Sequence, residues 1–113
     1  MELKVISEGD DYTHIALCGK MDNQGVVEIE EQFLALTAVR GLGSVIDISE
    51  LTFTGSNGLR LFLRAVKALR PLKKVVILLN PRPLLRSVLL DSGIQEAVII
   101  ENNTESAINR AKA

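Results

Sequence analysis

Tryptophan is absent from this chain of 113 residues, and aromatic residues together supply only 4% of it. A core must therefore be built from leucine, isoleucine and valine. Apolar residues make up 47% of the sequence, which excludes a disordered tail. Because the length is close to the commonest size of one domain, we expect a single domain that spans residues 1–113.

Cysteine occurs once, at Cys18, so an internal disulfide is excluded and a reducing compartment is expected. Cys18 lies in the apolar run IALC, which favours a buried and unreactive thiol. No apolar run approaches the roughly 18 residues of a membrane span, and the first residues lack the apolar core of a signal peptide. We therefore expect a cytoplasmic protein with no segment inserted in a membrane.

Neither sign of charge dominates the sequence. The 13 basic and 14 acidic residues give a net charge of −1, which argues against bulk electrostatic binding to nucleic acid.

The residue patterns of most enzymes are also missing. His14 is the only histidine and has no Cys–His spacing near it, so we predict a surface or hydrogen-bonded strand histidine rather than a metal ligand. The sequence contains no phosphate-binding loop and no GxSxG nucleophile motif. Asp47 and Glu50 lie near a predicted strand end, but nothing places a third carboxylate beside them. We expect neither an enzyme nor a bound metal or cofactor.

Hydrophobic spacing predicts strands and helices in alternation. The predicted strands are 3–7, 12–17, 44–48, 74–79 and 97–100, and the predicted helices are 24–39, 57–69, 84–90 and 104–111. The first two strands, joined by the turn at residues 8–11, indicate an antiparallel hairpin. Strands that then alternate with about four helices imply a mixed, mostly parallel sheet with an antiparallel edge, which is an α/β fold.

Ser56 lies just after the central predicted strand, in the segment FTGSNGLRLF. In sheets of this kind functional groups collect beyond the carboxyl ends of the parallel strands. Ser56 is predicted at or near the N-cap of the next helix, where its hydroxyl can accept from the N–H groups of Gly58 or Leu59. The neighbouring Gly55 leaves little bulk over the hydroxyl. Two interpretations stay open: a structural helix cap, and a hydroxyl that another protein modifies.

The helix after Ser56 carries a basic ridge. Arg60, Arg64 and Lys67 recur at helical spacing, and Arg70 extends the row. The ridge is either a solvated helix face or a docking surface for an acidic partner, and no acidic residue of the same helix neutralises it.

Three stretches resemble a known family: LCGKMD, VIDISELTFTGSNGL and KKVVILLNPRPLLRSVLLDSGI. They are similar to the STAS-domain patterns G-x-L-D, D-L-S-x-V-x-x-x-D-S-S-G-L and R-x-L-x-x-x-G-L. The chain therefore resembles the STAS domain that bacterial anti-sigma-factor antagonists share with the cytoplasmic parts of sulfate transporters. The resemblance covers nearly the whole chain.

The resemblance implies a regulatory binding protein that docks an anti-sigma factor, which is also a serine kinase, and is phosphorylated by it. The matching serine is Ser56, with Thr54 as a weaker candidate, and a metal-dependent phosphatase would reverse the modification. Gly55 stands where the antagonists usually carry aspartate, and Asn57 replaces a second serine. The expected partner-binding residues are Asp22, Thr54, Gly55, Asn57, Gly58, Arg60, Arg64 and Lys67.

Two other functions stay open. A scaffold without phosphorylation, such as a subunit of a transporter or signalling complex, would have no need of the missing aspartate. A module that binds a small molecule or nucleotide would use the helix N-terminus after Gly55. A homo-oligomer that pairs through apolar residues of the first hairpin also stays open.

Overall fold

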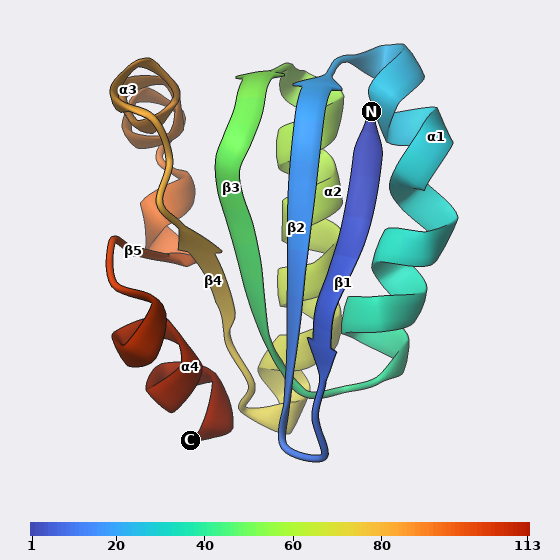
Figure 1. The fold of residues 1–113 in the computed structure, drawn as a ribbon, viewed down its shortest axis with the longest axis vertical. Helices are drawn as coiled ribbons and strands as arrows, with labels where there is room; N and C mark the ends of the chain where they lie inside the picture. The colour runs from blue at the N-terminus through green and yellow to red at the C-terminus, as the bar shows by residue number, and fades with distance from the viewer.

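A computed structural model describes all residues 1–113 and contains one sheet with helices on both faces (Figure 1). The strands are β1 (Glu2–Glu8), β2 (Tyr12–Met21), β3 (Gly43–Thr54), β4 (Val76–Leu79) and β5 (Ile99–Glu101). The helices are α1 (Asn23–Leu34), α2 (Ser56–Leu69), α3 (Pro83–Ser92) and α4 (Thr104–Lys112), with short turns η1 (Ala35–Val39), η2 (Arg70–Leu72) and η3 (Ile94–Glu96). No helix has the length and apolar character needed to cross a membrane.

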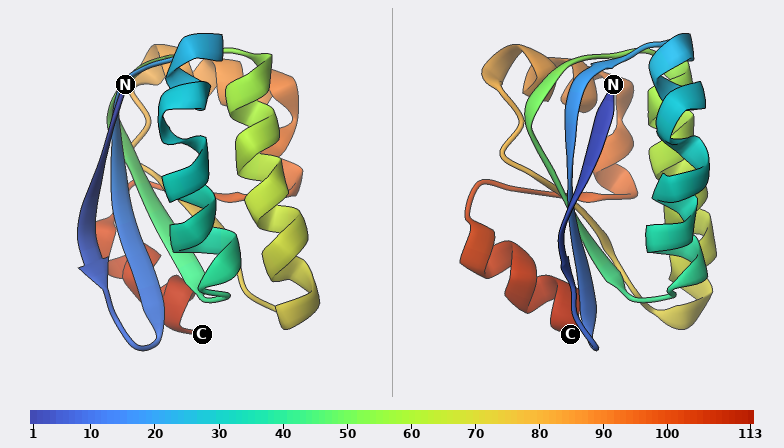
Figure 2. Two further views of the ribbon diagram at one scale, coloured as in Figure 1. Left: turned by 90° about the vertical axis from the view of Figure 1, so that its right-hand side faces the viewer. Right: turned by 45° about the vertical axis from the view of Figure 1, so that its right-hand side comes forward.

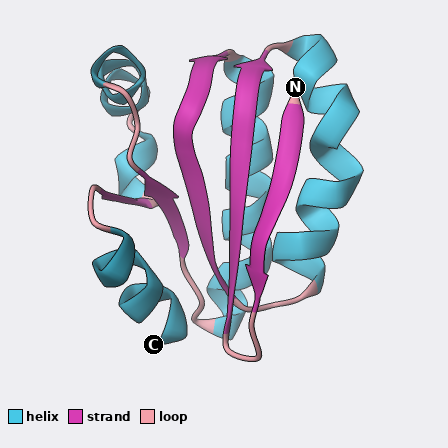
Figure 3. Ribbon diagram, viewed as in Figure 1, coloured by secondary structure: helices cyan, strands magenta, loops and turns pink.

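The strands lie in the order β1-β2-β3-β4-β5, which is also their order in the chain (Figure 3). β1 pairs with β2 in antiparallel fashion, and every later pair is parallel. The predicted hairpin, mixed sheet and four helices are therefore confirmed.

The order of the strands decides where the helices lie. Parallel strands joined through a helix cross over with a right-handed sense, so successive crossovers in one direction place their helices on one face. Side chains of α1, α2 and α3 accordingly join one core cluster of 21 buried residues. α4 follows the last strand and packs on the opposite face, where a smaller cluster of five residues holds it (Figure 2).

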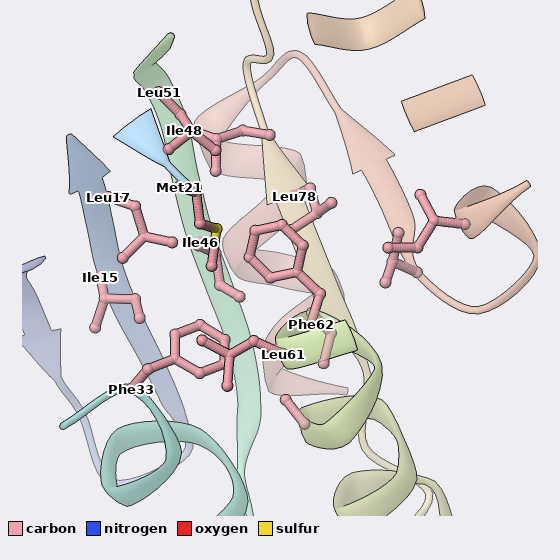
Figure 4. Close-up of a cluster of buried hydrophobic side chains, with 14 of the residues drawn as sticks. Ile15, Leu17, Met21, Phe33, Ile46, Ile48, Leu51, Leu61, Phe62 and Leu78 are labelled. Atoms are coloured by element: carbon pink, nitrogen blue, oxygen red, sulfur yellow. The ribbon is translucent and has the colours of Figure 1, made fainter. Parts of the chain in front are cut away.

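The larger cluster is filled by branched aliphatic side chains and two aromatic rings (Figure 4). The rings of Phe33 and Phe62, from α1 and α2, lie with their centroids 6.0 Å apart and their planes tilted by 59°. This geometry is favourable for an aromatic pair and fixes the two helices side by side over the sheet. The predicted buried stripe of the first helix is confirmed, since all its members are buried: Val26, Ile29, Phe33 and Leu36.

Several predicted boundaries were wrong. The central strand was predicted to end at Ile48, but β3 continues to Thr54 because its backbone stays paired with β2 through two register shifts. β2 likewise continues past Leu17 to Met21. The helix predicted at residues 24–39 is confirmed to within one residue, since α1 continues directly into the wider π-helical turn η1. The strand predicted at residues 97–100 begins only at Ile99.

Candidate functional site

The carboxyl ends of β2 and β3 meet at one end of the sheet, uppermost in Figure 1, and a helix begins directly after each strand. Met21 and Thr54 are register partners, and the N–H of Gly55 donates to the carbonyl of Met21 at 3.1 Å. The N-termini of α1 and α2 therefore start side by side. We call this region the strand-end junction; it comprises residues 20–24 and 53–57.

Asp22 is the N-cap of α1. Its Oδ1 accepts from the N–H of Gly25 at 2.8 Å, which satisfies one of the free donors in the first helical turn. The structure leaves no room for a side chain at Gly25, because a Cβ there would overlap the carbonyl of Lys20. Asp22, one of the expected partner-binding residues, therefore has a capping role and lies exposed at the junction.

Ser56 lies next to the N-cap, as predicted, but of the two open interpretations the structural helix cap is wrong. Gly55 occupies the N-cap in an extended conformation, Ser56 is the first helical residue, and no side chain caps the start of α2. Ser56 is exposed to solvent. Its hydroxyl has therefore no capping role, which removes the structural explanation for a serine at this position.

Two predicted contact residues lie inside the molecule. Thr54 is only 6% exposed, and its hydroxyl donates to the carbonyl of Gly55 at 3.3 Å. Gly58 is also buried, and a Cβ there would overlap the Thr54 hydroxyl and the side chain of Met21. Both residues hold α2 close against β2 and β3 and cannot touch a partner in this conformation.

Asn57 links the two helix N-termini. Its Nδ2 donates to Oδ1 of Asn23 at 2.6 Å, and its Oδ1 accepts from Nη1 of Arg60 at 2.7 Å. The asparagine that stands in the place of a second serine thus bridges α1 and α2 and orients the first member of the basic ridge.

The basic ridge is exposed along α2, as far as Arg70. Arg64 forms an ion pair with Glu30 of α1 at 3.2 Å, a neutralisation across helices that the sequence could not reveal. Both side chains are about half exposed, 54% and 46%, and ion pairs of this kind contribute at most about 1 kcal/mol. No ion pair involves Arg60 or Lys67, so most of the ridge is open to an acidic partner.

Phe53 is a junction residue that the sequence interpretation missed. It is 47% exposed, although aromatic side chains usually bury most of their surface. Its ring lies near Gly55, where an added Cβ would stand 3.5 Å away, an ordinary contact distance. A Cβ therefore fits at position 55 without overlap. No sequence pattern marked Phe53, because the exposure of residues 51–54 does not alternate and the segment was predicted as a loop.

His14 and Cys18 lie on β2, away from the junction. His14 is buried and its Nε2 has no hydrogen-bond partner. The prediction that its side chain is either exposed or hydrogen-bonded was therefore wrong. Burial lowers the pKa of His14, and the negative charge of Asp47 opposes this only in part. The Cys18 thiol is half-buried and free, rather than fully buried as predicted.

Comparison with known proteins identifies the class that this fold and junction represent. Residues 5–101 match the family described as "Mlab, STAS domain". Since the match spans most of the chain, the protein belongs to this STAS-domain family, as its sequence motifs indicated. None of the curated proteins gives a significant match.

Solved anti-sigma factor antagonists share the fold. Unphosphorylated SpoIIAA is 25% identical over 99% of each chain, with a TM-score of 0.74. The phosphorylated form of SpoIIAA from Bacillus is 26% identical, with a TM-score of 0.70, over 96% of this chain and 98% of that one. An antagonist from Mycobacterium paratuberculosis has a TM-score of 0.83 at 18% identity, over 99% and 96% of the two chains, and supports the fold alone.

Proposed function

We propose that this protein is a cytoplasmic regulatory binding protein of the anti-sigma-factor antagonist type and not an enzyme. It docks a kinase-like anti-sigma factor and thereby frees a sigma factor. The contact surface comprises the strand-end junction and the basic ridge: Asp22, Gly55, Ser56, Asn57, Arg60, Arg64 and Lys67. The observation that supports this best is the exposed Ser56, without a capping role, at the position of the serine in the family motif.

Phosphorylation of Ser56 switches the contact off. A phosphoserine adds about −1.5 to −2 charges, and the N–H groups of the first turn of α2 tolerate this charge. The local gain at an exposed helix N-terminus is only about 0.3–1 kcal/mol, too small to change a fold that is stable by roughly 5–15 kcal/mol. The modification therefore acts at the interface, where a desolvated or repelled charge costs several kcal/mol and every ~1.4 kcal/mol weakens binding tenfold. A metal-dependent phosphatase restores the docking form.

The first prediction concerns this modification. Incubation with ATP and the kinase-like anti-sigma factor of the same genomic neighbourhood should add the mass of one phosphate, and Ser56→Ala should abolish the gain. Mass spectrometry of the intact protein measures both. No gain, or a gain that survives Ser56→Ala, contradicts the phosphoswitch. The variant Gly55→Asp supplies the acidic neighbour at a position where a Cβ fits, and faster phosphorylation of this variant would show that the kinase recognises position 55.

A second candidate function is a scaffold that is never phosphorylated, such as a subunit of a transporter or signalling complex. Gly55 favours it, because a Cβ would fit at this position, so the glycine is not required by a steric clash there, and a scaffold has no need of the aspartate. The identity of the protein that co-purifies from cells separates the two candidates. An ATPase related to histidine kinases supports the antagonist, and a transporter ATPase supports the scaffold.

A further inference from the structure

The outer face of the α1–α2 layer carries its charges in two separate halves. α1 supplies Glu30 and Glu31, while Glu28 pairs with the N-terminal ammonium at 3.0 Å, and residues 23–39 contain no lysine or arginine. α2 supplies the basic ridge, and residues 56–70 contain no aspartate or glutamate. The two helices run side by side in Figure 2, so an acidic half adjoins a basic half on one surface.

Two contacts fix the relative level of the helices. Asn23 meets Asn57, and Glu30 meets Arg64; both pairs are 34 positions apart in the chain. α1 and α2 therefore run in the same direction and in register, so that any residue of α1 lies level with the residue 34 positions later. By this rule Val27 lies level with Leu61, and Glu31 lies level with Ala65.

The same face exposes one apolar side chain from each helix. Val27 is 74% exposed and Leu63 is 38% exposed. A shallow groove of about 390 Å³ separates the helices and is lined by Val27, Glu30 and Arg60 among others. Leu63 lies outside this groove, beside Arg60, Arg64 and Lys67, so each half of the face carries one exposed apolar side chain next to its charges.

We propose that this face binds a second copy of the chain, about a two-fold axis that runs along the helices between the two layers. This rotation exchanges left and right but keeps every residue at its own level along the axis. The acidic α1 of each copy then faces the basic α2 of the other. Along the axis, Glu31 of one copy is at the height of Arg64 and Lys67 of the other. Val27 of one copy is close to the height of Leu63 of the other. Each contact occurs twice, as in any isologous interface.

Charge complementarity favours a second copy over an unrelated partner. An acidic partner can pair with Arg60 and Lys67 but meets the unpaired Glu31 as a like charge, whereas a second copy can pair with residues of both signs. The inference does not depend on the proposed function. For the proposed function, the dimer has one consequence: it covers the basic ridge and competes with any partner that docks there.

The dimer is tested on the purified protein alone, so the result is independent of any kinase or anti-sigma factor. Sedimentation equilibrium over micromolar to millimolar concentrations should show a monomer–dimer equilibrium at low salt. The dissociation constant should rise with salt, because exposed charge pairs are screened over about 10 Å at 0.1 M ionic strength. A protein that stays monomeric throughout the series overturns the proposal.

A charge exchange identifies the surface. Glu31→Lys and Lys67→Glu should each raise the dissociation constant about tenfold or more, and the double variant should return it to within about threefold of the original. As controls, Glu105→Lys and Lys112→Glu reverse one acidic and one basic residue of α4, which lies on the opposite face of the sheet. These variants should leave the dissociation constant unchanged. The proposed interface is overturned if neither single variant changes the dissociation constant. It is also overturned if the double variant stays monomeric while circular dichroism shows the native fold.

Discussion

His14 lies buried in β2, and its Nε2 is the only buried side-chain polar atom without a hydrogen-bond partner. Burial disfavours the charged imidazolium more than the nearby Asp47 favours it, so the pKa of His14 lies below its usual range in the folded protein. In the unfolded chain the same group takes up a proton near its ordinary pKa of about 6.5.

The pH dependence follows from this difference. Between the lowered folded pKa and about pH 6.5 the unfolded state binds more protons, so stability is lost as the pH falls through that window. We predict a lower urea midpoint at about pH 5.5 than at about pH 7.5, and a smaller drop for His14→Gln, which cannot take up the proton. Equal drops in the two proteins would mean that His14 does not control the acid sensitivity.

At the scale of single elements, the start of α1 depends on one side chain. Asp22 is exposed and makes the only side-chain cap of that helix, to the N–H of Gly25. Asp22→Ala should lower the free energy of unfolding by about 1 kcal/mol, because one donor of the first turn is left to water. Asp22→Asn keeps an acceptor in the same place and should cost far less. Urea unfolding of the two variants measures the difference, and equal losses would contradict the capping role.

β3 shows why the boundaries of elements were hard to predict. Its first half reads as a short apolar run, and Ser49 and Glu50 then break the pattern. The strand nevertheless continues, because its backbone groups pair with β2 as far as Thr54 across two register shifts. Side-chain periodicity does not record pairing of this kind, so the exposed Phe53 could not be placed in advance.

At the scale of the whole molecule, α4 lies so close to the sheet that one position admits only glycine. A Cβ on Gly43 would overlap the backbone of Ala111 in α4. Only five buried residues, Ala107 and Ala111 among them, form the cluster on this side. The attachment of α4 therefore depends on close backbone packing more than on a large apolar area.

Gly43→Ala should consequently displace α4 and lower the free energy of unfolding by about 1–3 kcal/mol, the usual cost of overpacking. Hydrogen exchange should become faster in α4, while α2, which packs on the other face, keeps its protection. Uniform loss of protection in both helices would indicate instead that the two faces of the sheet unfold as one unit.

The sequence by itself determined the succession of strands and helices, the buried stripe of α1, the antiparallel hairpin and the family motif around Ser56. These features depend on local hydrophobic spacing and on residue types that are close together in the chain. The tertiary structure alone decided that Gly55 is the helix cap, that Thr54 and Gly58 are buried, and that Glu30 reaches Arg64. Each of these depends on backbone pairing or packing between segments more than 30 residues apart, for which local pattern carries no signal.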